Sequence, residues 1–167
     1  INRVKDQVGP MILNANGDPV RFSSYRIPVV PDVVSGFSGP LAGVLTGLEW
    51  AAENAPACEY VATFATDAPF LPSDLVEKLQ QLINIGAVLA CATSNNRHHP
   101  VFGLWPVCER SALREAMTED HIRKVDAWTS HYKLGIADFP VHPMDPFFNL
   151  NSPQDLARAE DFLASME

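Results

Sequence analysis

Apolar and polar positions alternate along the chain in blocks that predict strands and helices in turn. Short apolar runs predict strands, whereas apolar positions three or four residues apart predict amphipathic helices. The expected strands cover residues 10–13, 26–30, 60–65, 87–93, 101–105 and 134–140. Two helices are expected to begin near Pro40 and Pro72, and two more to cover roughly 107–117 and 119–131. A final helix is expected to be capped at Ser152.

This order of elements is typical of an α/β fold. We expect three layers, with a mostly parallel sheet covered by helices on both faces. The 167 residues should form a single domain, residues 1–167, around one core. The strand at 60–65 should be buried on both faces. The last helix should be buried along one stripe, which comprises Leu156, Ala159, Leu163 and Met166.

Charge and cysteine content exclude several classes of function. The net charge is −8, and no basic run exceeds Arg123-Lys124, which argues against a nucleic-acid partner. No apolar run approaches the roughly 18–20 residues that span a bilayer, and the first ten residues do not resemble a signal peptide. The three cysteines include no Cys-x-x-Cys pair, so we expect free thiols in the reducing cytoplasm.

Polar side chains follow the first three predicted strands. Ligands of open α/β sheets bind outside the carboxyl ends of the strands, so we expect Asn14, Asp32 and Asp67 along one edge. In "YVATFATDAPFLPSDL", Asp67 directly follows an apolar strand and precedes Ala68-Pro69. One interpretation is a turn-capping aspartate. The other is an oxygen ligand for Mg²⁺, which one or two carboxylates and substrate phosphates commonly hold.

Three further segments allow a structural and a binding interpretation. "GFSGPLAG" at 36–43 begins a helix, either as an ordinary start or as a phosphate or ribose site. "SNNRHHP" at 94–100 is expected to be a polar loop in which Arg97 contacts an anion, and adjacent His98 and His99 point apart, which argues against a shared metal. In "FFNLNSP", Asn149 and Asn151 either cap the helix or bind a polar heterocycle.

The ordered set of motifs resembles one family. "NAN", "PD", "GPLAG", "TDAPFLPSDL", "HPVFGL" and "FFNLNSPQDLA" are similar to segments of the molybdenum cofactor guanylyltransferases, across about residues 10–160. The resemblance implies a Rossmann-like nucleotidyltransferase fold and GTP and molybdopterin as substrates. It implies attack by the terminal phosphate of molybdopterin on the α-phosphorus of GTP, with Mg²⁺ as cofactor and pyrophosphate as product. It also implies contact with molybdenum-insertion and molybdoenzyme-maturation proteins.

The resemblance also implies roles for individual residues. Asn14 and Asp32 would contact GTP, Gly43 would let the backbone approach the nucleotide, and Asp67 would bind Mg²⁺ and act in catalysis. The pterin side would be formed by Arg97, His99, Pro100, Asn149 and Asn151.

The family pattern begins with a strand and a glycine-rich phosphate loop that have no counterpart here. We expect that loop to belong to a longer protein, because a sheet without its first central strand would expose apolar edges. Thr66 also stands where the family commonly has cysteine. Two alternatives remain: a related nucleotidyltransferase that uses CTP or another phosphorylated acceptor, and a non-catalytic nucleotide- or pterin-binding protein.

Overall fold

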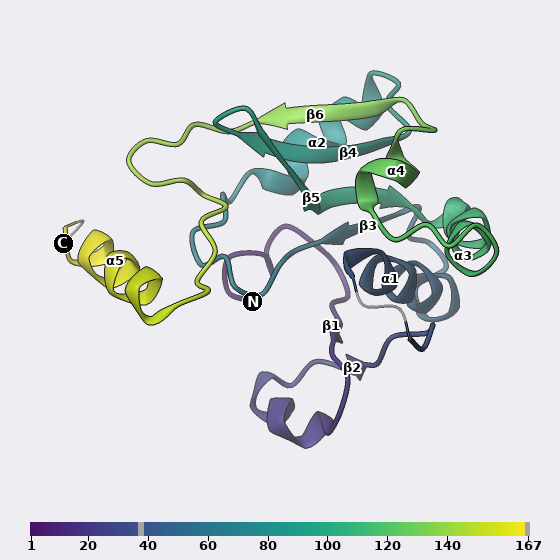
Figure 1. Cartoon of the computed structure of the whole chain (residues 1–167), viewed down its shortest axis with the longest axis horizontal. Coiled ribbons are helices and arrows are strands. Elements are labelled where there is room, and N and C mark those ends of the chain that lie inside the picture. The colour runs from purple at the N-terminus through teal and green to yellow at the C-terminus, as the bar shows by residue number, and fades with distance from the viewer. Residues whose placement is uncertain (37–38, 166–167) are drawn as a thin grey trace.

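A four-stranded sheet forms the centre of the molecule. The computed structural model describes residues 1–36 and 39–165. The strand order is β3-β5-β4-β6, and β5 runs antiparallel to both β3 and β4, whereas β6 is parallel to β4. Strands β3, β4 and β6 therefore point the same way (Figure 1). The strands are β3 (Tyr60–Thr63), β4 (Leu89–Ser94), β5 (Arg97–Pro106) and β6 (Leu134–Asp138).

A second, smaller sheet pairs β1 (Leu13–Asn14) with β2 (Val29–Val30) in parallel. A 3₁₀ helix, η1 (Pro19–Tyr25), connects these two strands. The predicted strands at 10–13 and 26–30 thus exist in shortened form.

The prediction of a polar loop at 94–100 is wrong about the length of the loop. Only Asn95 and Asn96 form the turn, both with positive φ, 48° and 58°. Asparagine tolerates this conformation, which suits two-residue hairpins. Residues 97–100 belong to β5 and pair with the end of β4. The hairpin reverses β5, so three strands of the sheet share one direction and the fourth opposes them.

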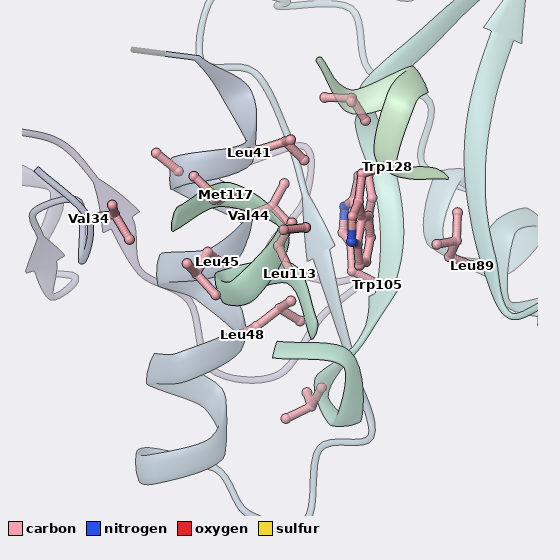
Figure 2. Close-up of a cluster of buried hydrophobic side chains, with 14 of the residues drawn as sticks. Val34, Leu41, Val44, Leu45, Leu48, Leu89, Trp105, Leu113, Met117 and Trp128 are labelled. Carbon is pink, nitrogen blue, oxygen red and sulfur yellow. The ribbon is translucent and has the colours of Figure 1, made fainter. Parts of the chain in front are cut away.

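Helices cover both faces of the sheet, which confirms the three-layer α/β prediction. On one face α1 (Pro40–Asn54), α3 (Arg110–Thr118) and the short α4 (Val125–Thr129) pack on Leu89 and Trp105. Figure 2 shows leucines of α1 directed towards the side chains of α3 and towards Trp105 and Trp128, whose rings are tilted against each other with a centroid distance of 5.9 Å. On the other face α2 (Leu75–Asn84) packs on alternate residues of the same strands. Each face thus has its own apolar cluster.

The boundaries of three predicted helices differ from the structure. Helix α2 begins at Leu75, three residues after the predicted start. The predicted helix at 107–117 consists of η2 (Val107–Glu109) followed by α3. The predicted helix at 119–131 is reduced to α4, because the residues before it form no regular element.

The predicted burial of the strand at 60–65 is also wrong. All four residues of β3 are only partly buried, whereas all six residues of β4 are buried. Strand β3 lies at the edge of the four-stranded sheet and pairs with β5 alone among the described strands, so the two interior positions belong to β5 and β4.

The last helix, α5 (Pro153–Ala164), begins as predicted but packs differently. Ser152 Oγ accepts the Asp155 N–H at 3.2 Å, and the Asp155 carboxylate accepts the Ser152 hydroxyl at 2.8 Å. Of the predicted buried stripe, Ala159 is buried, but Leu156 and Leu163 remain 49% and 48% exposed. Met166 lies outside the described residues. Helix α5 lies away from the sheet (Figure 1) and contacts Phe70 through Phe162. Within the described ranges, no helix has the length and apolarity to cross a membrane.

Helix α1 is buried in the core and α5 is largely exposed, so shortening a leucine in each helix should destabilise the protein by different amounts. Leu45 is fully buried in α1, so Leu45→Ala should lower the free energy of unfolding by about 2–5 kcal/mol. Leu156→Ala removes a half-exposed side chain and should change it by about 0.5 kcal/mol or less. Urea denaturation followed by tryptophan fluorescence measures both values. Equal losses would show that α5 belongs to the core.

Candidate active site

The first group of candidate residues lies where β1 and β2 end. The parallel pairing sets Asn14 opposite Val30, so Asp32 comes within reach of the first turn. Asn14 Nδ2 donates to Asp32 Oδ1 at 3.0 Å, and Asn16 Nδ2 donates to Asp32 Oδ2 at 2.8 Å. The Asp32 N–H in turn donates to Asn16 Oδ1 at 2.9 Å. The structure therefore joins Asn14 and Asp32, as expected, and adds Asn16.

Gly43 lies directly beside this group, in the second turn of α1. A Cβ atom at Gly43 would lie 2.7 Å from Asn14 Oδ1, which is closer than real Cβ contacts allow. The residue must therefore be glycine so that Asn14 can keep its bond to Asp32. Thr46, one turn further along α1, accepts the Val33 N–H at 3.1 Å. Helix α1 thus holds the segment that carries Asp32.

Asp67 lies in the turn after β3. Its Oδ1 atom is buried and has no hydrogen-bond partner among the described residues. A buried, unpaired carboxylate oxygen is costly, so the site calls for a cation or a donor. The described part of the chain holds no cluster of three or more His, Cys, Asp or Glu that could bind a metal on its own. A lone carboxylate fits a cation such as Mg²⁺, whose other ligands are substrate phosphates and water.

The loop at residues 145–151 is tied to the Asp67 turn. The Leu150 N–H donates to the Asp67 carbonyl oxygen at 2.8 Å. Asn149 and Asn151 flank this contact, and both are exposed. The Asn151 N–H donates to Asp155, so its backbone supports the helix cap. Within the described residues neither asparagine side chain makes a hydrogen bond, which leaves both amides available to a ligand.

His99 lies on β5 beside the same loop. Its Nε2 atom lies 2.7 Å from Ser94 Oγ, and the Ser94 hydroxyl donates to Asp145 Oδ1 at 2.9 Å. The imidazole lies against the Phe147 ring with a centroid distance of 4.7 Å. Burial lowers the pKa of His99, and nearby Arg97 and His98 lower it further, while Asp145 acts in the opposite direction.

The other two predicted residues of this side differ in exposure. Arg97 is exposed at the start of β5, and Pro100 is partly buried next to His99. The structure thus groups the predicted residues into one cluster that comprises Asn14, Asp32 and Gly43, and a second cluster in which the loop at 145–151 connects Asp67 to His99. Within the described chain no hydrogen bond links the two clusters directly.

Sequence reasoning missed Ser94 and Asp145. Ser94 is the last residue of a buried strand, the same signal that singled out Asp67. Asp145 precedes a proline in a loop, which predicts only a turn. A polar groove of about 640 Å³ between α1 and α3 is a separate feature. Its Arg114 and Glu49 pair with each other at 2.7 Å, and among the described residues that line it no side-chain N or O atom is both buried and without a hydrogen-bond partner, unlike Asp67 Oδ1.

Comparison with known proteins identifies relatives along the whole chain. Residues 1–133 match the MobA-like NTP transferase domain. A molybdenum cofactor guanylyltransferase of Rhodopseudomonas palustris (strain HaA2) is 52% identical over 161 residues, which is 96% of this chain and 75% of that relative.

Two solved structures share the fold. Molybdopterin-guanine dinucleotide biosynthesis protein A of Archaeoglobus fulgidus has a TM-score of 0.71 at 19% identity and covers 98% of this chain and 85% of its own. A Mycobacterium tuberculosis protein solved as a complex with manganese has a TM-score of 0.58 at 12% identity, with 94% and 80% covered. The family match and the close relative confirm the resemblance seen in the motifs. The chain belongs to the molybdenum cofactor guanylyltransferases and is a nucleotidyltransferase.

Proposed function

We propose that this protein transfers GMP from GTP to the terminal phosphate of molybdopterin. A phosphate oxygen of molybdopterin forms a bond to the α-phosphorus of GTP. The bond between that phosphorus and the oxygen bridging to the β-phosphate breaks, and pyrophosphate leaves. The observation that carries the proposal is the unpaired, buried Asp67 Oδ1 at the carboxyl end of β3 in a chain of this family.

Asp67 is the residue we assign to a divalent cation, with Mg²⁺ as the specific proposal. Its Oδ1 has no competing partner in the described chain, so a cation would offset the burial of its charge. A similar fold has been solved with manganese. When bound, the cation would neutralise phosphate charge in the transition state. Asp67 itself provides a fixed anchor, because its backbone is held by Leu150.

Asn14 and Asp32 form the nucleotide side of the proposed site. Each Asp32 carboxylate oxygen accepts one asparagine amide, which holds the carboxylate in place and leaves further lone pairs free. Those lone pairs suit the ribose hydroxyls or the N–H groups of guanine. Gly43 supports this function by leaving room for Asn14.

The pterin side of the proposed site follows the loop at 145–151. The exposed amides of Asn149 and Asn151 can both donate and accept hydrogen bonds, which suits a heterocycle rich in nitrogen and oxygen. Arg97 adds a positive charge for the phosphate, and His99 and Pro100 line the strand next to it. We place the reaction in the cytoplasm, in keeping with three free cysteines, Cys58, Cys91 and Cys108.

A pyrophosphate-release assay tests the proposal. The full-length protein is supplied with molybdopterin, Mg²⁺ and each nucleoside triphosphate in turn. We expect release with GTP alone. Release with CTP and not GTP would favour the related cytidylyl enzyme, and GTP binding without release would favour a non-catalytic protein.

Removing the Asp67 carboxylate should separate activity from stability. Asp67→Ala should lower kcat about a hundredfold or more, because the cation loses its protein ligand. The thermal midpoint should stay unchanged or rise, since a buried unpaired oxygen is removed. Asp120→Ala, in the exposed turn after α3, is the matched control. Full activity in Asp67→Ala would remove Asp67 from the site.

Gly43→Ala tests the nucleotide side. The new Cβ must displace Asn14 Oδ1 and so disturb the bond to Asp32, which should raise KM for GTP about tenfold. Gly47→Ala is the control on the same helix, because its Cβ would meet Val61 at 3.2 Å and not Asn14. Steady-state kinetics with varied GTP gives both values. The same KM in both variants and the wild type would mean that the Asn14–Asp32 bond does not serve nucleotide binding.

A further inference from the structure

Ser94 joins two side chains that come from distant parts of the sequence. It ends β4 and is fully buried. In the β4–β5 hairpin Ala92 pairs with His99, so Ser94, two residues further along β4, shares the face of the sheet on which His99 lies. Asp145, 51 residues later, approaches Ser94 from the loop. The result is a continuous chain of contacts from Asp145 through Ser94 to His99.

The Ser94 hydroxyl has a single proton, and this determines which group donates in each of the two hydrogen bonds that Ser94 makes, to Asp145 and to His99. An ionised carboxylate only accepts hydrogen bonds, so the Ser94 hydroxyl donates to Asp145 Oδ1. Asp145 Oδ1 is also held by the Phe147 N–H at 3.0 Å. Ser94 Oγ must then accept a hydrogen bond from His99 Nε2, at 2.7 Å. The neutral imidazole therefore carries its proton on Nε2, and Nδ1 keeps a lone pair.

The surroundings of His99 keep the ring neutral and fixed. Burial is the largest effect on the pKa of His99 and lowers it; Arg97 and His98 on β5 add to this, and Asp145 on the loop partly opposes it. Phe147 lies against one side of the imidazole, and Phe102 meets it edge-on with a centroid distance of 6.3 Å. The side chain is still partly exposed, so a ligand can reach it.

We propose that Ser94 and Asp145 are positioning residues that fix His99 as the Nε2–H tautomer, so that Nδ1 accepts a hydrogen bond from an N–H or O–H group of the acceptor substrate. The identity of that substrate rests on the proposed function. Pterin rings carry amino and amide N–H groups, which are donors of this class. Asp145 belongs to the loop at 145–151, which Leu150 also bonds to Asp67. The same loop therefore carries the residue that fixes the His99 tautomer and contacts the turn of the proposed cation ligand.

Nitrogen NMR of the protein labelled in histidine tests the tautomer without any substrate. Long-range proton–nitrogen correlations distinguish the two neutral tautomers, and His99→Gln assigns the signal among the five histidines. At pH 8 we expect His99 to be protonated on Nε2 alone. Ser94→Ala should yield a mixture of tautomers, whereas His98→Gln, which changes the exposed neighbour, should leave the His99 signal as it is. A wild-type ring protonated on Nδ1, or an unchanged signal in Ser94→Ala, would overturn the proposal.

Kinetics test the contact with the acceptor. Ser94→Ala and Asp145→Ala should each raise KM for molybdopterin about tenfold and leave KM for GTP within about twofold. His98→Gln should change neither constant. An equal rise in both constants would indicate a purely structural role and contradict the proposal. No turnover by the wild type would refute the proposed function and with it the substrate contact, while the NMR result would still decide the tautomer.

The pH dependence gives an independent signature. The pKa of His99 is lowered, so its ring stays neutral until the pH falls below the ordinary histidine value of 6.5. Protonation then places a proton on Nδ1 and abolishes the acceptor, so KM for molybdopterin should rise at low pH. The phosphate of the substrate titrates near pH 6 as well, so His99→Gln serves as the reference. The rise should be smaller in that variant, and identical profiles would contradict the proposed contact.

Discussion

The loop at residues 145–151 lies across the carboxyl ends of three strands, and the candidate site depends on this placement. Asp145 accepts the hydroxyl of Ser94, which ends β4. Phe147 packs edge-to-face on Phe139, which follows β6, with a centroid distance of 5.4 Å. The Leu150 N–H bonds to the carbonyl of Asp67, which follows β3. One loop can reach all three ends because β3, β4 and β6 point the same way (Figure 1).

The site also combines satisfied and unsatisfied carboxylates. Asp32 is held by two asparagine amides, and Asp145 by a hydroxyl and a backbone N–H. Asp67 Oδ1, although buried, lacks a partner within the described chain. Buried polar atoms in folded proteins are nearly always paired, so an exception points to a ligand that completes the site. Partners within the protein thus hold Asp32 and Asp145 in place, and Asp67 is the carboxylate that we propose for a cation.

Local signals in the sequence predicted much of this arrangement. Helical spacing and Pro40 predicted α1, and Ser152 and Asp155 predicted the cap of α5. The strand-end rule predicted Asn14, Asp32 and Asp67 along one edge of a sheet. The structure bonds Asn14 to Asp32 at the ends of β1 and β2, whereas Asp67 follows β3 of the separate four-stranded sheet. The features that local signals failed to predict depend on distant partners. Strand β5 reverses through a two-asparagine turn, and the Ser94–Asp145 bond joins residues 51 positions apart. Helix α5 leaves Leu156 and Leu163 half-exposed although their spacing predicts a buried stripe.

The central claim is that Asp67 anchors a cation that carries GTP at the edge crossed by this loop. A crystal structure of the full-length protein with Mg²⁺ and a non-hydrolysable GTP analogue tests it most directly. We predict that Asp67 Oδ1 coordinates the metal, that the same metal binds the nucleotide phosphates, and that the guanosine lies against Asn14 and Asp32. A metal held by other carboxylates, with Asp67 Oδ1 left uncoordinated, would contradict the account.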